Sequence, residues 1–450
     1  MSEHDHAPEP ATNTLHTRRE FLRTSMLGAA AAWTLPVFLQ KTFLTLDAMA
    51  ADSAIQYATG KDHPILVVLQ MAGGNDGLNT VVPFADDAYY RARPVIGIKP
   101  EQVLKVNDYI GLHPKLAGLK GLLDDGHLAL IQGVGYPNPN RSHFRSTEIW
   151  QTATDAERVE NTGWLGRYFD SCCSGADPTV GVAIGNDSPQ AFAGTTPKGI
   201  SFSRPEQYRW VNNQRGTAAA DSEALFKQMN QPEDAHSSLE TNTGASIGSI
   251  NGAKHAEMGA LEFLQRTALD AQMSSDKVLE ISRKFRSTVD YPHTQIGDSL
   301  SLVGRMIAGG LPTRVYYVSQ GGFDTHTNQV GTHDRLMGEF NDAVSAFCKD
   351  LQAQGNFNRV LLMTFSEFGR RVTQNASNGT DHGAAAPMFV LGGGIKAGLF
   401  GKYPSLNQLN GGDLMFNVDF RSVYASVLDN WLKAPSQQVL GRKFSTLPIV

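Results

Sequence analysis

The stretch that decides the fold is Ile65-Leu66-Val67-Val68-Leu69, which is followed by the glycine-rich segment Gly73-Gly74-Asn75-Asp76-Gly77. A continuous run of apolar residues, most of them branched, is typical of a strand that is buried on both faces, as in a parallel sheet. The glycines after it predict a loop at the carboxyl end of that strand, where the backbone can approach a ligand closely. The segment therefore indicates a ligand site next to a buried sheet.

The same pattern recurs along the chain. Further apolar runs that predict buried strands lie at residues 128–132, 314–318, 359–364 and 388–391. Apolar residues at helical spacing lie between or beside them, at residues 115–124, 255–285, 296–308 and 334–352. Strands that alternate with helices predict the α/β class, with a mainly parallel sheet covered by helices on both faces. In such sheets ligands bind at the carboxyl ends of the strands.

Composition narrows the function classes. The 450 residues include 39 Lys and Arg against 44 Asp and Glu, so the net charge of −5 gives no basic surface for nucleic acid or an anionic membrane. Three cysteines cannot form a disulfide framework in a chain of this length. Residues 213–254 are polar and poor in large apolar side chains, and we interpret them as an insertion within a single domain of residues 51–450.

The first 50 residues are typical of a twin-arginine (Tat) signal peptide. Arg18-Arg19 precedes an uncharged apolar stretch, residues 26–39, and Ala48-Met49-Ala50 offers a cleavage site. That stretch is too short to cross about 30 Å of hydrocarbon, so no permanent membrane span is expected. An ordinary amphipathic start with two chance arginines is the alternative. The signal predicts contact with the Tat translocase during export and a periplasmic or extracellular location.

Two segments after strands offer candidate catalytic and metal-binding residues. Asp76 can bind a cation, although a turn or a helix cap is the common role of an Asn-Asp-Gly segment. Ser142 precedes a predicted helix, whose amino end stabilises a nearby anion and favours a nucleophilic hydroxyl. An ordinary N-cap is the alternative for this serine. Arg141 and His143 on either side of it can hold a tetrahedral oxyanion.

Three further clusters carry acids and histidines. Asp324 and His326 lie two residues apart in a glycine-led loop and can both reach one cation. Glu367 and Arg370 follow the strand at 359–364, and the adjacent Asp381-His382 precedes the strand at 388–391. Separate caps and turns are the alternative for each cluster. Together the clusters favour a hydrolytic centre with one or two metal ions.

These segments resemble a known bacterial family, domain-of-unknown-function family 1501, from about residue 63 to the carboxyl end. The motifs that carry the resemblance are Gly73–Pro83, Leu112-His113-Pro114, Asn140–Phe144, Gly321–His326, Ser366–Arg370 and Thr380–Gly383. The resemblance implies export by the Tat route and a three-layer α/β/α fold similar to the alkaline phosphatase and sulfatase superfamily. Its chemistry is carried over as an expectation.

The resemblance also implies roles for single residues. It matches Asp76 to a metal-binding acid, Ser142 to a nucleophile, and Asp324 with His326 to the next acid and histidine, although the superfamily usually spaces these two four residues apart. The superfamily's Asp-His pair matches Glu367 by position and Asp381-His382 by identity. We prefer the match by position, which makes His382 the third ligand of the metal bound by Asp324 and His326. Asp76 and Glu367 then face a second metal, or none.

Two functions follow as hypotheses. The first is a metal-dependent hydrolase of phosphate or sulfate esters, in which Ser142 attacks and Arg141 or Arg370 holds the anion. Its cofactor is a divalent ion (zinc, calcium or manganese), and its substrate is a small-molecule or glycan ester. The sulfatase signature is absent around Ser142, which disfavours formylglycine chemistry. The second is a non-catalytic exported relative that binds a glycan or a partner protein. Convergence of Asp324, His326 and His382 within metal-ligand distance distinguishes the two.

Overall fold

The computed structural model describes residues 63–173, 177–195, 199–207 and 274–450. Contacts divide the chain into residues 1–48 and 49–450, and all described residues belong to the second unit. The Tat signal and the 213–254 insertion lie outside the described residues. In the part of the chain that is described, no helix is long and apolar enough to cross a membrane.

A nine-stranded sheet forms the centre of the described chain. Its strands follow the order β11-β5-β10-β9-β1-β8-β6-β7, and β14 pairs with β5. Every pairing is parallel except those of β10, which runs antiparallel to both β5 and β9. The bounds are β1 Ile65–Met71, β5 Leu128–Gly135, β6 Gly181–Ile184, β7 Ile200–Phe202, β8 Val315–Gln320, β9 Val360–Phe365, β10 Ala386–Gly392, β11 Gly398–Phe400 and β14 Val418–Asp419.

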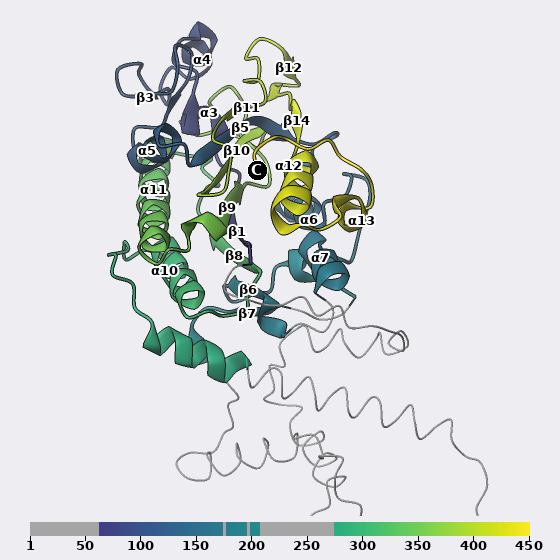
Figure 1. Cartoon of the computed structure of the whole chain (residues 1–450). Coiled ribbons are helices and arrows are strands. Elements are labelled where there is room, and N and C mark those ends of the chain that lie inside the picture. The colour runs from purple at the N-terminus through teal and green to yellow at the C-terminus, as the bar shows by residue number, and fades with distance from the viewer. Residues whose placement is uncertain (1–62, 174–176, 196–198, 208–273) are drawn as a thin grey trace, which may run out of the picture. The chain divides into compact units, whose positions relative to one another are not determined.

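Helices cover both faces of this sheet, as Figure 1 shows. One face is covered by α5 (Ala117–Asp124), α10 (Gln295–Ala308) and α11 (Gln329–Ala353). The other is covered by α6 (His143–Thr152), α7 (Trp164–Cys172), α12 (Phe420–Ser426) and α13 (Ser436–Leu440). The α/β class with a mainly parallel, doubly covered sheet is therefore confirmed.

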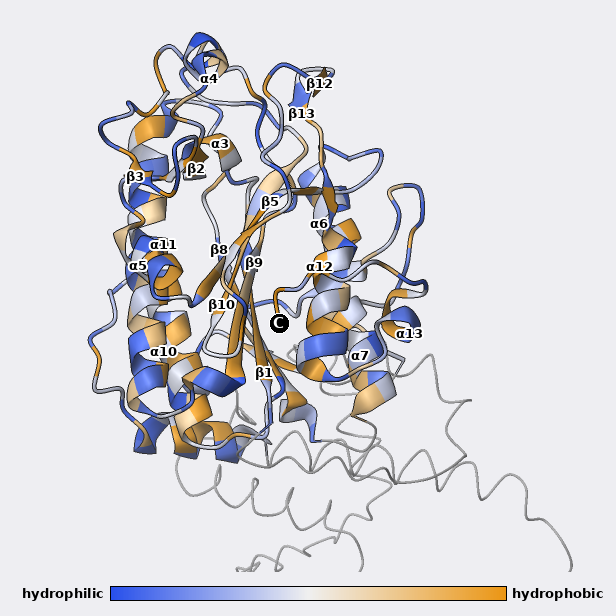
Figure 2. Cartoon of the chain, turned by 45° about the horizontal axis from the view of Figure 1, so that its top comes forward, coloured by the Kyte–Doolittle hydropathy of each residue, from blue (hydrophilic) through white to orange (hydrophobic). Residues whose placement is uncertain are grey.

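Alternation along the strands explains the two layers. Side chains of a strand point to opposite faces in turn. Accordingly, Ile65, Val67 and Leu69 of β1 pack in the core beneath α10 and α11, whereas Leu66 and Val68 pack with α7 and α12. All seven residues of β1 are buried, as its unbroken apolar run predicted. Figure 2 shows the strands between the helical layers as mostly apolar.

Shorter elements cap the sheet. The short helices α3 (Gly77–Thr80) and α4 (Asp87–Ala92) follow β1. One small sheet consists of β2 (Val81–Val82), β3 (Leu104–Lys105) and β4 (Gly111–Leu112). A second small sheet consists of β12 (Leu409–Asn410) and β13 (Asp413–Leu414). The 3₁₀ turns are η1 Pro178–Val180, η2 Gln190–Phe192, η3 Pro205–Gln207 and η4 Phe357–Arg359, and η5 Val427–Leu432 is a π-helical turn. Residues 274–284 are helical.

The sequence-based boundaries hold with three differences. The second strand was predicted at residues 128–132, but β5 continues to Gly135, since β10 pairs with Val134 and β14 pairs with Val134 and Gly135. The helix α11 begins at Gln329, earlier than the predicted residue 334. Residues 419–432, whose apolar residues recur at the spacing of one helix, are divided between α12 and the π-helical η5.

Candidate metal centre

The direction of the strands brings the predicted clusters together. β1, β8, β9 and β5 all run in one direction, so their carboxyl ends meet at one edge of the sheet. β10 runs the opposite way, which places the segment before it, with Asp381 and His382, at the same edge. An isolated bridge between Arg370 and His382 joins the segments that follow β9 and precede β10. The site is therefore built from four loops, those that follow β1, β5 and β8 and the one that joins β9 to β10.

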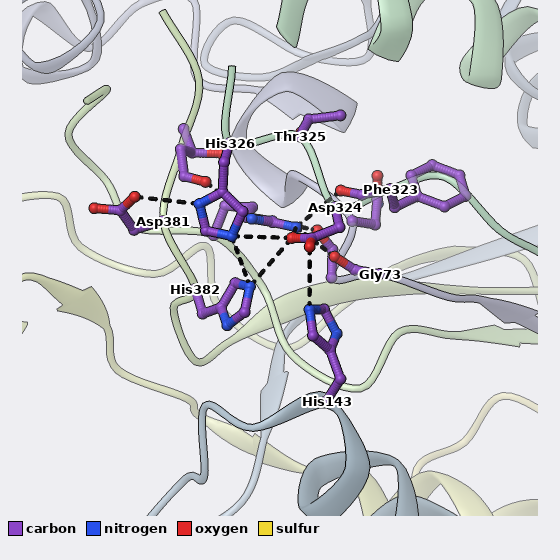
Figure 3. Close-up of polar contacts among 12 residues, drawn as sticks. Gly73, His143, Phe323, Asp324, Thr325, His326, Asp381 and His382 are labelled. Carbon is purple, nitrogen blue, oxygen red and sulfur yellow. Dashed lines mark hydrogen bonds and ion pairs between the residues drawn. The ribbon is translucent and has the colours of Figure 1, made fainter. Parts of the chain in front are cut away.

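Three side chains converge there at metal-ligand spacing. Asp324 Oδ1 lies 3.0 Å from His326 Nε2 and 3.1 Å from His382 Nε2. The two Nε2 atoms lie 2.9 Å apart (Figure 3). Two ligands that are each about 2.0–2.2 Å from one cation lie roughly 3 Å from each other. Asp324, His326 and His382 therefore meet the condition that the sequence analysis set for a metal centre.

Acceptors on the far side of each ring orient the histidines. Nδ1 of His382 lies 2.8 Å from the carbonyl oxygen of Arg141, which can only accept, so this Nδ1 carries the proton. His326 Nδ1 lies 3.3 Å from Asp381 Oδ1, and a hydrogen bond from Asn375 is the main cause that lowers the pKa of that aspartate. In a neutral imidazole with a protonated Nδ1, Nε2 offers a lone pair. This is the outer-shell arrangement of metal-binding histidines.

His143 adds a fourth donor that the sequence analysis did not assign to the metal. Its Nδ1 lies 2.8 Å from Oε1 of the buried Glu367, and its Nε2 lies 3.4 Å from Asp324 Oδ2 (Figure 3). No hydrogen-bond partner from the described residues reaches this buried Nε2. Donor atoms of His143, Asp324 and His382 lie within 4.8 Å of one another. The orphaned nitrogen and the facing lone pairs fit a cation among these four side chains.

Asp324 is held as an anion. Its partial burial opposes ionisation, but the hydrogen bond and the charge of Arg370 outweigh that effect and lower the pKa of Asp324 to about 2. Its side chain is 46% exposed, so the carboxylate also faces solvent. A half-exposed carboxylate that stays ionised is available to a divalent ion across the neutral pH range.

The two arginines proposed to hold a substrate anion are occupied by protein groups. The buried Arg370 donates to the carbonyl oxygens of Gly73, Gly74, Phe323 and Thr380 and, at 2.7 Å, to Asp324 Oδ1. Arg141 donates through Nε and Nη2 to Asp413 Oδ2, at 3.0 and 2.5 Å. Arg370 thus fastens the strand ends and the ligand loop together, and Arg141 fastens the loop before α6 to β13.

Glu367 and Asp381 are the candidate acids after β9 and before β10. Neither contacts the donor atoms that converge, Asp324 Oδ1 and the Nε2 atoms of His326 and His382. Glu367 accepts hydrogen bonds from the backbone of Gly73, at 2.8 Å, and faces His143 Nδ1. Asp381 faces His326 Nδ1 and accepts from Asn375 Nδ2 at 3.1 Å. The structure therefore places both acids behind histidines, as partners that orient the rings.

Asp76 lies in a separate buried network. It is 1% exposed, and its Oδ1 caps α3 by accepting from the backbone of Leu78 and Asn79. Its Oδ2 accepts from Arg93 Nη1 at 2.6 Å and from Gln329 Nε2. Burial opposes its ionisation, but the charge and hydrogen bond of Arg93 outweigh burial and lower the pKa of Asp76. The structure does not bring Asp76 into the cluster of Asp324, His326 and His382.

Ser142 is the N-cap residue of α6, and its side chain makes no capping hydrogen bond within the described chain. Its backbone N–H donates to Asn140 Oδ1 at 2.8 Å, and the residue is exposed. The neighbours on both sides reach the candidate metal centre, Arg141 through its carbonyl oxygen and His143 through its ring. The ordinary capping role, the alternative for this serine, is not what its hydroxyl does here.

Comparisons with known proteins find distant structural likenesses and one family match. No curated protein matches the chain. Solved structures that resemble it include the C-terminal periplasmic domain of EcEptC from Escherichia coli in complex with Zn, at 11% identity, 74% coverage of each chain and a TM-score of 0.30. A protein in the alkaline phosphatase superfamily from Vibrio parahaemolyticus is 8% identical, with 82% of this chain and 71% of that chain covered and a TM-score of 0.31. PsFucS1 sulfatase from Pseudoalteromonas sp. is 10% identical, with 84% and 68% covered and a TM-score of 0.33.

At these identities and scores, the likeness carries no inference about activity. The family match is of a different kind, because it spans residues 64–421 and includes every residue of the candidate centre. This chain therefore belongs to the family described as "Protein of unknown function (DUF1501)".

Proposed function

We propose that this protein is an exported metal-dependent hydrolase of phosphate or sulfate esters. The observation that carries the proposal is the donor set: the Nε2 atoms of His326 and His382 approach one carboxylate oxygen of Asp324, and His143 Nε2 faces the other. These separations suit ligands that share one cation, and His382 Nε2 offers a lone pair because its Nδ1 donates to the Arg141 carbonyl oxygen. Imidazole and carboxylate donors suit zinc, manganese or iron better than calcium, which prefers oxygen ligands.

A divalent cation in this position supplies Lewis-acid activation of a phosphoryl or sulfuryl oxygen. The chain's own residues supply the rest. Ser142 offers an exposed hydroxyl, free of capping duty, at the amino end of α6, where the helix dipole favours negative charge. The Glu367 carboxylate and the Arg141 carbonyl fix the rings of His143 and His382, so that the donors are oriented before substrate arrives.

A second function is supported by two observations. Arg370 donates to four carbonyl oxygens and to Asp324, and Arg141 donates through Nε and Nη2 to Asp413, so these donors are not available to a substrate oxyanion in this arrangement. Phe144, next to His143, is 92% exposed, and an aromatic ring in this position can stack on a sugar or a partner's side chain. Both features suit a non-catalytic exported relative that binds a glycan or another protein near the cation.

Metal analysis of the folded protein, followed by a screen of phosphate and sulfate monoesters, tests the first function. We expect about one bound divalent ion and turnover of at least one ester class. The matched variant Asp324→Asn removes the central carboxylate and should lose both the ion and the turnover. A metal-loaded wild-type protein that hydrolyses no ester would support the binding function instead, and a metal-free protein would refute the centre.

Export is a separate part of the proposal and rests on the sequence alone. Changing Arg18 and Arg19 together to Lys should leave the precursor in the cytoplasm, because the Tat receptor recognises the arginine pair. Cell fractionation measures the result. Undiminished export of the double variant would contradict the Tat assignment.

A further inference from the structure

The acid after β1 is already neutralised by the protein itself. The Arg93 guanidinium meets Asp76 with neither side chain exposed, and it also donates to Asn79 Oδ1 at 2.8 Å and to the carbonyl oxygens of Val372 and Arg371 at 2.9 Å. Both oxygens of Asp76 accept hydrogen bonds from protein donors. A metal ion at Asp76 would have to displace a buried guanidinium, and breaking a buried ion pair of this kind is strongly unfavourable because it leaves an uncompensated buried charge.

Glu367, the other acid expected at a second cation, also has protein groups near both of its carboxylate oxygens. Glu367 Oε1 accepts from the backbone of Gly73 and faces His143 Nδ1, and its Oε2 lies 3.5 Å from Ser366 Oγ. Glu367 is 2% exposed. A second cation would therefore need two acids that the structure uses for other contacts, one in the Arg93 pair and one behind His143.

Gln329 connects the buried Asp76 to the metal-ligand loops. Its Nε2 donates to Asp76 Oδ2, which fixes the orientation of the side-chain amide. Its Oε1 then accepts from Thr325 Oγ1 at 3.1 Å and from Thr380 Oγ1 at 2.6 Å. Thr325 lies between Asp324 and His326, and Thr380 lies two residues before His382. All four side chains in this set are buried.

We propose that the centre holds a single cation and that the Arg93–Asp76–Gln329 chain replaces a second metal as the part that fixes the ligands. In this arrangement Asp76 binds no metal. It anchors Gln329, which ties the loop of Asp324 and His326 to the loop of His382 through two threonine hydroxyls. Gln329 is thus a positioning residue. This inference rests on the proposed function, which includes the cation. It adds that the site binds one cation and that Gln329 positions the loops that carry its ligands.

Titration of the full-length wild-type protein with Co²⁺ tests the number of cations, because Co²⁺ bound to nitrogen and oxygen ligands reports its coordination in the visible spectrum. We expect one equivalent, which Asp324→Asn abolishes and Asp76→Asn retains with an unchanged spectrum. Two equivalents, or loss of the bound ion in Asp76→Asn, would overturn the single-cation inference and leave the metal centre standing. Zero equivalents in the wild type would refute the metal centre itself. Should Asp76→Asn fail to fold, the wild-type stoichiometry still decides.

The positioning role of Gln329 is tested by Gln329→Met, which keeps the size of the side chain and removes its hydrogen bonds. Outer-shell changes weaken metal binding by about 10–100-fold, and we expect a loss of that size with an altered Co²⁺ spectrum. The matched control is Gln151→Met, a buried glutamine in the opposite helical layer that bonds Tyr317 and Ala191. Both variants should lose stability, but only Gln329→Met should change affinity. Wild-type affinity in Gln329→Met would overturn the role.

Discussion

Asp76 and Asp324 follow neighbouring strands of one sheet, β1 and β8, and yet their surroundings are opposite. Asp76 is 1% exposed and pairs with Arg93, whereas the Asp324 side chain is 46% exposed and faces the Nε2 atoms of histidines. Both carboxylates are held ionised against the effect of burial, the first by Arg93 and the second by Arg370.

The difference shows that an acid after a buried strand does not by itself make a metal ligand. What decides is whether protein donors already fill both oxygens of the carboxylate. Around Asp76 the donors and acceptors already match, since Arg93 and Gln329 fill one oxygen and backbone amides fill the other. Around Asp324, Arg370 donates to Oδ1, and the Nε2 atoms of His326, His382 and His143 face the two oxygens, a donor set that suits a cation.

The largest effect should separate the two acids by stability. Asp76→Asn leaves Arg93 buried beside a neutral amide, and we expect the free energy of unfolding to fall by about 3–5 kcal/mol. Asp324→Asn also removes a carboxylate from the buried Arg370, but Asp324 is half exposed and Arg370 keeps four carbonyl acceptors, so the loss without metal should be smaller than in Asp76→Asn. Urea denaturation of both variants in chelator measures the difference. Equal losses would contradict the contrast between a structural and a ligating carboxylate.

Metal binding should depend on Asp324 and not on Asp76, the opposite of the order expected for stability. A ligand that binds only the folded state stabilises it by about 2.7 kcal/mol at 100 times its Kd. We expect Zn²⁺ to raise the melting temperature of the wild type and of Asp76→Asn, and to leave Asp324→Asn unchanged. Differential scanning fluorimetry with and without chelator gives the shift. A Zn²⁺ shift that persists in Asp324→Asn would place the ion elsewhere.

The buried network around Asp76 should make the free energy of unfolding depend on pH through His333. Burial is the main cause that lowers the pKa of His333 to about 3, and its Nε2 lies 3.2 Å from Asn75 Oδ1, next to Asp76. Between pH 6.5 and 3 the unfolded chain binds a proton that the folded chain does not, so the free energy of unfolding should fall as the pH falls. His333→Gln should flatten this slope, and the exposed His293→Gln should keep it. An unchanged slope in His333→Gln would contradict the assignment.

The smallest effect on stability is expected at Ser142. Because its hydroxyl makes no capping bond to α6, Ser142→Ala should change the free energy of unfolding by less than about 0.5 kcal/mol. If Ser142 is the nucleophile, the same variant loses ester turnover and keeps its bound metal. A loss of about 0.5–2 kcal/mol with activity retained would identify an ordinary N-cap.

Most of the fold follows from local patterns. The apolar runs at residues 65–69, 314–318 and 359–364 gave the positions of β1, β8 and β9, since strands buried on both faces need such runs. The reversed direction of β10 has no local signal, because its apolar run is the same whichever way the strand points. The extension of β5 through Gly133 depends on β14, about 280 residues further along the chain.

Some residues of the candidate site were also predicted from the sequence, whereas the roles of others depend on contacts between distant parts of the chain. The clusters that contain Asp324-His326 and Asp381-His382 were expected at one sheet edge because both lie beside strand ends, and the family resemblance implied His382 as the third ligand. His143 was assigned to an oxyanion, since nothing local indicates that Glu367 orients its ring from 224 residues away. Likewise, Arg93 in the chain beyond α4 carries no motif that marks it as the partner of Asp76. Long-range pairing of charges requires the fold.

The reversed strand β10 also has a consequence for how the protein matures. The cation ligands come from the loop after β5, the loop after β8 and the segment that leads into β10, so closing the site requires contacts between distant parts of the chain. Such contacts form slowly because loop closure costs entropy before any contact repays it. The complete donor set therefore exists only once the central strands are in register. Metal binding should therefore follow folding, and the rate of metal binding during refolding should report the rate at which the sheet is completed.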